Sequence, residues 1–123
     1  MNRRETELLM LDESASRSEA IQSRKLDLVA DAVVKQFAEN HALKEVHILP
    51  LSGKFSVYFF FWRTEHLMAA KNGGVFKKIM DAFYAEMDRM GRGRREDLEV
   101  HFEWDSDENV LKKYGSYQFY FRK

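Results

Sequence analysis

The sequence predicts an α+β fold, a two-layer sandwich in which two main helices cover one face of a four-stranded, mainly antiparallel sheet. Two long segments repeat their apolar residues every three or four positions, as amphipathic helices do. Several short segments alternate apolar and polar residues, as half-buried strands do. These segments follow the order α-β-β-α-β-(α)-β, which is typical of helices packed on one side of an antiparallel sheet.

The length and composition indicate one globular domain. The chain has 123 residues, 45% of them hydrophobic, which suffices for a single core. It contains no cysteine, so it offers no disulfide, no thiol nucleophile and no cysteine-based zinc site. The apolar run 8–11 is too short for a signal peptide, and the run 57–62 has only the length of a strand. We therefore expect a soluble, cytoplasmic protein that makes no membrane contact.

The first helix is predicted from Ser18 to about Asn40. Ser18 followed by Glu19 is a suitable helix start. Beyond it, apolar residues recur at helical spacing: Ile21, Leu26, Val29, Ala30, Val33, Val34 and Phe37. Residues 1–17 are polar apart from 8–11, so we expect a flexible N-terminal arm or a short helix there, followed by a single α+β domain over residues 18–123.

The segment EVHILPLSGKFSVYFFFW, residues 45–62, predicts a β-hairpin with Ser52 and Gly53 in the turn. Pro50 has no backbone N–H to donate, which favours an edge strand. Alternation divides the second strand into two sets of side chains. We expect one set to face the helices, namely Phe55, Val57, Phe59 and Phe61. The opposite face then carries Tyr58, Phe60 and Trp62.

The remaining segments predict three helices and two strands. A short helix begins at Thr64 and ends before Gly73 and Gly74. A longer amphipathic helix covers residues 75–90 and ends at Gly91. After it we predict a strand at 98–104, a short helix at 107–114, and a fourth strand at 117–121.

Strand 98–104 carries charged residues on the side opposite its apolar ones. These charged residues, the acids that follow the strand and the aromatic residues expected on the same face form a candidate partner-binding surface. Its residues are Glu99, His101, Glu103, Asp105, Asp107, Tyr58, Phe60 and Trp62. Aromatic rings would anchor a protein partner, and the charges would steer it. The same pattern also fits strands that are buried on both faces, with Glu99 and Glu103 keeping an edge soluble.

The segment DSDEN places Asp105, Asp107 and Asn109 at the first, third and fifth positions of a calcium loop. The sixth position requires glycine and is Val110, and the twelfth requires glutamate and is Ser116. Acids at a helix start account for the pattern without a metal. The four histidines lack the spacing of a zinc helix, and there is no nucleophile motif or phosphate loop. We therefore expect no metal, no cofactor and no enzymatic activity.

The loop GRGRR offers Arg92, Arg94 and Arg95 as alternative phosphate-binding residues. Residues 51–95 carry 9 basic and 4 acidic side chains, whereas residues 1–50 carry 7 and 9, and residues 96–123 carry 4 and 7. The net charge is zero, so nothing draws the whole chain toward nucleic acid. Arginines are also ordinary at a helix C-terminus. Nucleic-acid binding is therefore an alternative function, as is a homodimer paired through the aromatic face.

The order of a helix, VHILPLSGKFSVYFFFW, a helix and DLEVHFEWDSDENVLKKYGSYQFYFRK resembles small bacterial immunity proteins. These are the antitoxins of polymorphic and contact-dependent toxin systems, and the YezG-like group is similar. The resemblance covers about residues 20–123. It implies a noncatalytic protein that binds and neutralises a cognate toxin, for example a nuclease, inside the producing cell. The chain lacks the strongly acidic balance common among nuclease inhibitors, and no binding residue carries over.

Overall fold

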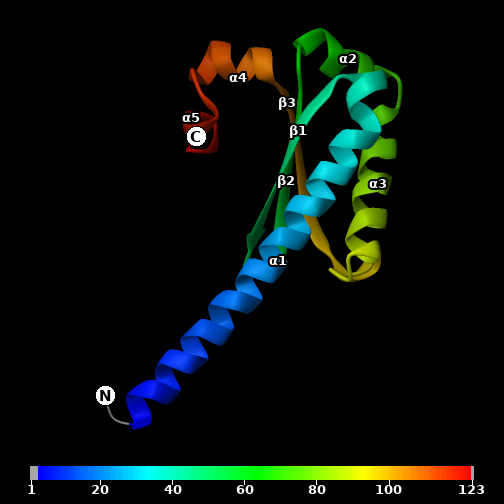
Figure 1. Ribbon diagram of the computed structural model, residues 1–123. Helices are drawn as coiled ribbons and strands as arrows, with labels where there is room; N and C mark the ends of the chain where they lie inside the picture. Colours follow the sequence, from blue (N-terminus) through cyan, green and yellow to red (C-terminus); the bar gives the residue numbers. More distant parts are fainter. Residues whose placement is uncertain (1–2, 123) are drawn as a thin grey trace.

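A computed structural model of the chain describes the backbone of residues 3–122 and the side chains of residues 19–122. Figure 1 shows the order of its elements. They are α1 (Arg3–His41), β1 (Leu43–Leu51), β2 (Lys54–Phe61), α2 (Thr64–Asn72), α3 (Val75–Arg89), a 3-10 turn (Arg95–Asp97), β3 (Glu99–Ser106), α4 (Asp107–Tyr114) and α5 (Tyr117–Phe121). The α+β class is confirmed, and so are the helices predicted at 64–72, 75–90 and 107–114.

The sheet has three strands in the order β1-β2-β3, so the prediction of four strands is wrong. β1 and β2 form the expected antiparallel hairpin. Ser52 and Gly53 have φ angles of 47° and 80°, which are typical of the two-residue turn that suits twisted strands. β3 pairs parallel to β2, so the sheet is also not mainly antiparallel. The reason is the connection through α2 and α3, which returns the chain to the end of the sheet where β2 began.

The segment predicted as a fourth strand is instead the short helix α5. Gly115 has a φ of 79° and ends α4, which turns the chain sharply. Ser116 then caps α5, because its Oγ accepts a hydrogen bond from the backbone N–H of Phe119 at 3.3 Å. Helical spacing brings Tyr117, Tyr120 and Phe121 against the sheet, whereas Phe119 points outward and is 59% exposed.

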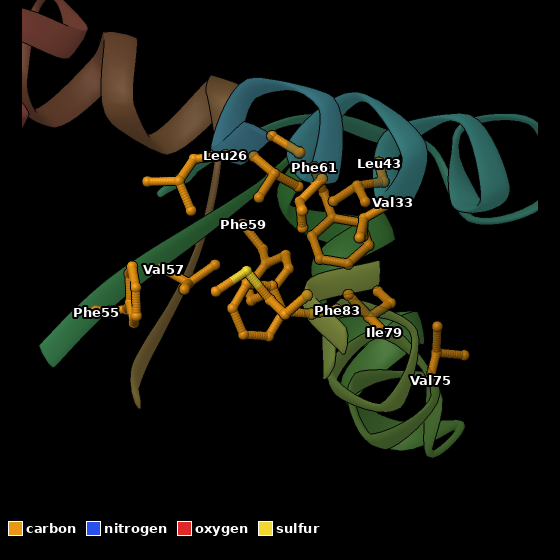
Figure 2. Packing of buried hydrophobic residues seen from close by; sticks show 14 of the residues in the cluster. Leu26, Val33, Leu43, Phe55, Val57, Phe59, Phe61, Val75, Ile79 and Phe83 are labelled. Carbon is orange, nitrogen blue, oxygen red and sulfur yellow. The ribbon is translucent and has the colours of Figure 1, made fainter. Parts of the chain in front are cut away.

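The main core lies between the sheet and the helices α1 and α3. Figure 2 shows Phe59 and Phe61 of β2 gathered with Ile79 and Phe83 of α3 in this layer. The buried residues of the core are Leu26, Val29, Ala30, Val33, Leu43, Val46, Phe55, Val57, Phe59, Phe61, Ala70, Val75, Ile79, Phe83 and Met87. The predicted helix-facing set of β2 is therefore confirmed, as is the packing of two main helices on one face.

Helix α1 is longer than the sequence predicts, because it begins at Arg3 and not at Ser18. Figure 1 shows its N-terminal half extending beyond the sheet. It ends at His41, where Ala42 takes a left-handed φ of 57° and turns the chain into β1. The side chains of residues 1–18 lie outside the described part of the chain, and the flexibility expected of residues 1–17 stays a prediction. Among the described residues, no helix combines the length and apolarity needed to cross a membrane.

Candidate interaction face

The second face of the sheet, opposite α1 and α3, carries all the charged side chains of the three strands, and we call it the polar face. From β1 it receives Glu45, His47, Leu49 and Leu51, with Lys44 reaching it from the register shift between Leu43 and Glu45. From β2 and β3 it receives Lys54, Ser56, Tyr58, Phe60, Glu99, His101, Glu103 and Asp105. The polar face contains every strand residue of the predicted partner-binding surface.

Helices α4 and α5 cover part of the polar face, on the side of the sheet away from α3 (Figure 1). Phe60, Val110 and Tyr120 form a second buried cluster there, with Tyr58 and Phe121 packed against it. The rings of Tyr58 and Phe121 meet edge to face with centroids 4.9 Å apart. Of the three aromatic residues predicted to anchor a partner, Phe60 is therefore fully buried within the chain and Tyr58 is half-buried. Trp62 follows β2 and is 52% exposed.

A network of polar side chains joins α4 and α5 to β1. The Nζ of Lys44 donates to Asp107 Oδ1 at 2.5 Å and lies 3.2 Å from Glu45 Oε1. The hydroxyl of Tyr117 donates to the same Asp107 oxygen at 2.7 Å. Glu45 also contacts Nε2 of His47 at 2.8 Å. Lys44 and Asp107 are both largely buried, so this network is a structural connection between the sheet and the C-terminal helices.

The contacts of the network shift the pKa values of Lys44, Asp107, Glu45 and Tyr117. Burial alone lowers the pKa of Lys44, but hydrogen bonds to Asp107 and Glu45 outweigh burial and raise it. Burial raises the pKa of the Asp107 carboxyl, yet hydrogen bonds from Lys44 and Tyr117 bring it below its ordinary value. The pKa of Glu45 is lowered in the same way by His47 and Lys44. Burial and the neighbouring carboxylate raise the pKa of the Tyr117 phenol well above its usual range.

Asp105 and Ser106 organise the start of α4. Oδ1 of Asp105 accepts hydrogen bonds from the Ser106 N–H at 2.8 Å and from Asn109 Nδ2 at 2.9 Å. Ser106 is fully buried, and its Oγ accepts from the Asn109 N–H at 3.1 Å. The interpretation of DSDEN as a helix start is confirmed. Within residues 19–122, no group of three or more acidic, histidine or cysteine side chains could hold a metal ion.

The acidic row of β3 lies in the part of the polar face nearer the hairpin turn. The side chains of Glu99 and His101 are 70% and 68% exposed, and Glu103 is half-buried. Glu99 pairs with Lys54 at 3.1 Å, and Glu103 lies 3.6 Å from Nε2 of His101. The strands together carry four carboxylates and two lysines, so the polar face has a net negative charge.

Two leucines accompany the acidic row on the polar face. Leu49 and Leu51 of β1 are 40% and 61% exposed. An exposed apolar pair beside a row of exposed and half-buried carboxylates is typical of a surface that binds another protein.

The basic loop is mostly committed to contacts within the chain. Arg92 donates to Gln22 of α1 and lies over the ring of Phe55, 5.5 Å from its centroid. Arg95 pairs with Asp81 at 2.8 Å. Arg94 is exposed. Two of the three arginines predicted as alternative phosphate ligands therefore already contact side chains of the same chain, which weakens the nucleic-acid alternative.

The sequence missed the parts of the polar face that depend on long-range contacts. Lys44 and Tyr117 were not singled out, although their side chains connect β1 to the C-terminal helices. The sequence gives no signal for the role of Lys44, because the register shift beside it, which turns its side chain toward Asp107, leaves no mark in the sequence.

No protein-family model, no curated protein and no solved structure matches this chain. The resemblance to immunity proteins therefore stays a prediction.

Proposed function

We propose that this chain is a noncatalytic protein-binding domain that acts as an immunity protein inside the producing cell. In this role it binds a cognate toxin through the uncovered part of the polar face. The observation that supports the proposal is the combination of Glu99 and Glu103 with the exposed side chains of Leu49 and Leu51. Apolar residues supply the contact area, and carboxylates steer a partner that presents lysine or arginine.

The proposed surface differs in two respects from the one that the sequence suggests. The carboxylate of Asp105 binds the start of α4, and that of Asp107 binds Lys44. Both therefore act on the partner only through their electrostatic field, without direct contact. Phe60 contributes to folding and not to binding, because α5 covers it. Leu49 and Leu51 are the exposed apolar residues that take its place, in addition to Trp62 of the predicted set.

Charge reversal on the polar face tests the proposal. The double variant Glu99→Lys/Glu103→Lys and the wild type serve as baits in lysate of the producing cells, and captured proteins are identified by mass spectrometry. The matched control, Glu96→Lys/Asp97→Lys, makes the same charge change at exposed residues beside β3. We expect one partner that the wild type and the control capture and the polar-face variant loses. With the purified partner, the on-rate of the variant should fall about tenfold at low salt.

A second step tests the immunity function itself. The captured protein is expressed alone and together with each of the three chains. We expect it to arrest growth alone, and the wild type and the control to restore growth where the polar-face variant does not. A harmless captured protein, or a partner that all three chains capture equally, would refute the proposal. Light scattering of the purified chain at micromolar concentration tests the homodimer alternative, which requires a stable dimer paired through this face.

A further inference from the structure

The two edges of the sheet differ in their capacity to accept another strand. In a two-residue hairpin the pair beside the turn is hydrogen-bonded, and bonded and non-bonded pairs alternate from there. Pro50 pairs with Phe55, next to the turn pair of Leu51 and Lys54. The nitrogen of Pro50 therefore points outward at the edge of β1. Because proline has no N–H, that edge lacks a donor, and strand addition is disfavoured there.

β3 forms the other edge, and no strand of the described residues pairs with its outer side. It contains no proline, so every outward backbone N–H can donate. Its core-facing residues Val100, Phe102 and Trp104 remain half-buried. Their neighbours in the register on β2 are Phe55, Val57 and Phe59, which are all buried, with exposures of 9%, 0% and 0%. The core layer is thus complete over β2 and open along the edge of β3.

A pocket of about 340 Å³ lies beside this open edge. Its lining comes from three elements, namely Leu67, Met68 and Lys71 of α2, Phe76 of α3 and Trp104 of β3. Trp104 is stacked on Phe76 with ring centroids 3.8 Å apart, which fixes the inner wall of the pocket. Met68 forms an outer wall and is 44% exposed. The pocket is mainly apolar and can take a large aliphatic or aromatic side chain.

We propose that the free edge of β3 binds an extended segment of the partner by strand addition, and that this segment alternates basic with large apolar residues. Side chains of an added strand point alternately to the two faces of the sheet. Those on the helix side reach the pocket and the half-buried core residues. Those on the other side lie next to Glu99 and Glu103, where lysine or arginine is favoured. This inference rests on the proposed function, for which it specifies the partner segment and its mode of binding.

A second copy of β3 fits this edge less well than a basic segment. Pairing two identical strands edge to edge would bring their rows of Glu99 and Glu103 together. Like charges on neighbouring strands destabilise the pairing. A basic partner segment instead neutralises the row, so charge complementarity selects the occupant.

The probe for the edge is a capped peptide of eight residues, the length of β3, with alternating leucine and lysine. One control peptide has the same composition with all leucines before all lysines, and another has glutamate in place of lysine. Binding is measured by titration calorimetry, and the amides of β3 are followed by NMR and hydrogen exchange. We expect only the alternating lysine peptide to bind, and the β3 amides to gain protection.

Methylation of the peptide backbone distinguishes strand addition from a purely side-chain contact. An added strand directs alternate N–H groups toward β3 and the others toward solvent. N-methylation of one alternate set should therefore weaken binding at least tenfold, and methylation of the other set should have little effect. Equal effects of the two sets, or no binding of the unmodified peptide up to about 1 mM, would overturn the proposal.

Two variants of the protein test whether the peptide binds beside the pocket at the edge of β3. Met68→Glu places a charge at the outer wall of the pocket and should weaken peptide binding at least tenfold. Leu111→Glu, at an equally exposed apolar residue of α4, is the matched control and should leave it unchanged. If the cellular partner binds through the polar face but is insensitive to Met68→Glu, the edge proposal is wrong and the proposed function stands. If the peptide binds as described but no toxin is captured, the edge proposal stands and the immunity function is wrong.

Discussion

Lys44 lies where β1 shifts register against β2, and its side chain is the centre of the polar network. Its ammonium group contacts Asp107, Glu45 and the hydroxyl of Tyr117. It also lies 5.0 Å from the centroid of the Trp62 ring. One cation thus balances two half-buried carboxylates, so its loss leaves Asp107 with only the Tyr117 hydroxyl and Glu45 with His47.

Substitution of Lys44 by methionine should lower the free energy of unfolding by about 2 kcal/mol. Methionine keeps an unbranched side chain of similar length and removes the charge, so the half-buried Asp107 carboxylate loses its main partner. Urea unfolding followed by circular dichroism measures the change. Lys54→Met is the matched control, because it breaks the exposed pair with Glu99 and should cost less than about 0.5 kcal/mol. Equal losses in the two variants would contradict a structural role for the network.

The sequence predicts roles of residues that depend on near neighbours, and it misses those that depend on distant ones. The acids of DSDEN were correctly interpreted as a helix start, since the contacts of Asp105 with Ser106 and Asn109 are local. The bond from Lys44 to Asp107 joins residues 63 positions apart. Phe60 was expected at the surface for the same reason, because the helix that covers it lies far along the chain.

At the scale of elements, α5 is a helix although its apolar residues alternate as in a strand. The aromatic residues Tyr117, Phe119 and Phe121 alternate, which predicts a strand. Tyr117, Tyr120 and Phe121 fit one face of a helix equally well, and a short segment cannot separate the two periods. Gly115 and Ser116 decide the outcome, because they form the turn and the cap that begin a helix.

Substitution of Ser116 by alanine should destabilise α5 by about 1 kcal/mol, since the cap of the Phe119 N–H is lost. Hydrogen exchange should become faster in α5 before it changes in the main core. Ser23→Ala, at an exposed position within α1, is the matched control and should be neutral or slightly stabilising. If Ser116→Ala left exchange in α5 unchanged, the capped helix would be the wrong description of this segment.

The parallel pairing of β3 was equally beyond the sequence at this scale. The alternation in residues 98–104 predicts a strand and identifies its two faces correctly. The alternation does not indicate whether the strand pairs parallel or antiparallel, because that depends on how the helices α2 and α3 return the chain to the sheet. The free edge that we propose as a binding site follows from this arrangement and from Pro50 at the opposite edge.

At the scale of the whole molecule, the sheet separates two apolar clusters, one on each of its faces. The larger cluster packs under α1 and α3, and the smaller one under α4 and α5. The network around Lys44 connects the smaller cluster to the sheet, and the pKa values of Lys44, Glu45, Asp107 and Tyr117 are shifted away from neutrality. The stability of the molecule should therefore depend on pH at both extremes.

Stability should be highest between about pH 5 and pH 10 and fall on either side. The pKa values of Asp107 and Glu45 are lowered from their ordinary values of 3.8 and 4.5, so their contribution is present above those values and disappears as pH falls through the lower folded values. The pKa values of Lys44 and Tyr117 are raised from 10.5 and 10.0, so their contribution is present below pH 10 and disappears as pH rises further. Urea midpoints from pH 2 to pH 12 measure both limbs.

Tyr117→Phe identifies the source of the alkaline limb. The wild-type phenol ionises more easily in the unfolded chain than in the folded one, so each step in pH above 10 favours unfolding. Phenylalanine has no such proton, and the variant should lose stability less steeply between pH 10 and pH 12. At neutral pH the free energy of unfolding of the variant should be lower by about 1 kcal/mol, because Asp107 loses one hydrogen bond. Parallel alkaline limbs in the two proteins would show that the Tyr117 phenol is not the source of the alkaline loss of stability, which would then belong to Lys44.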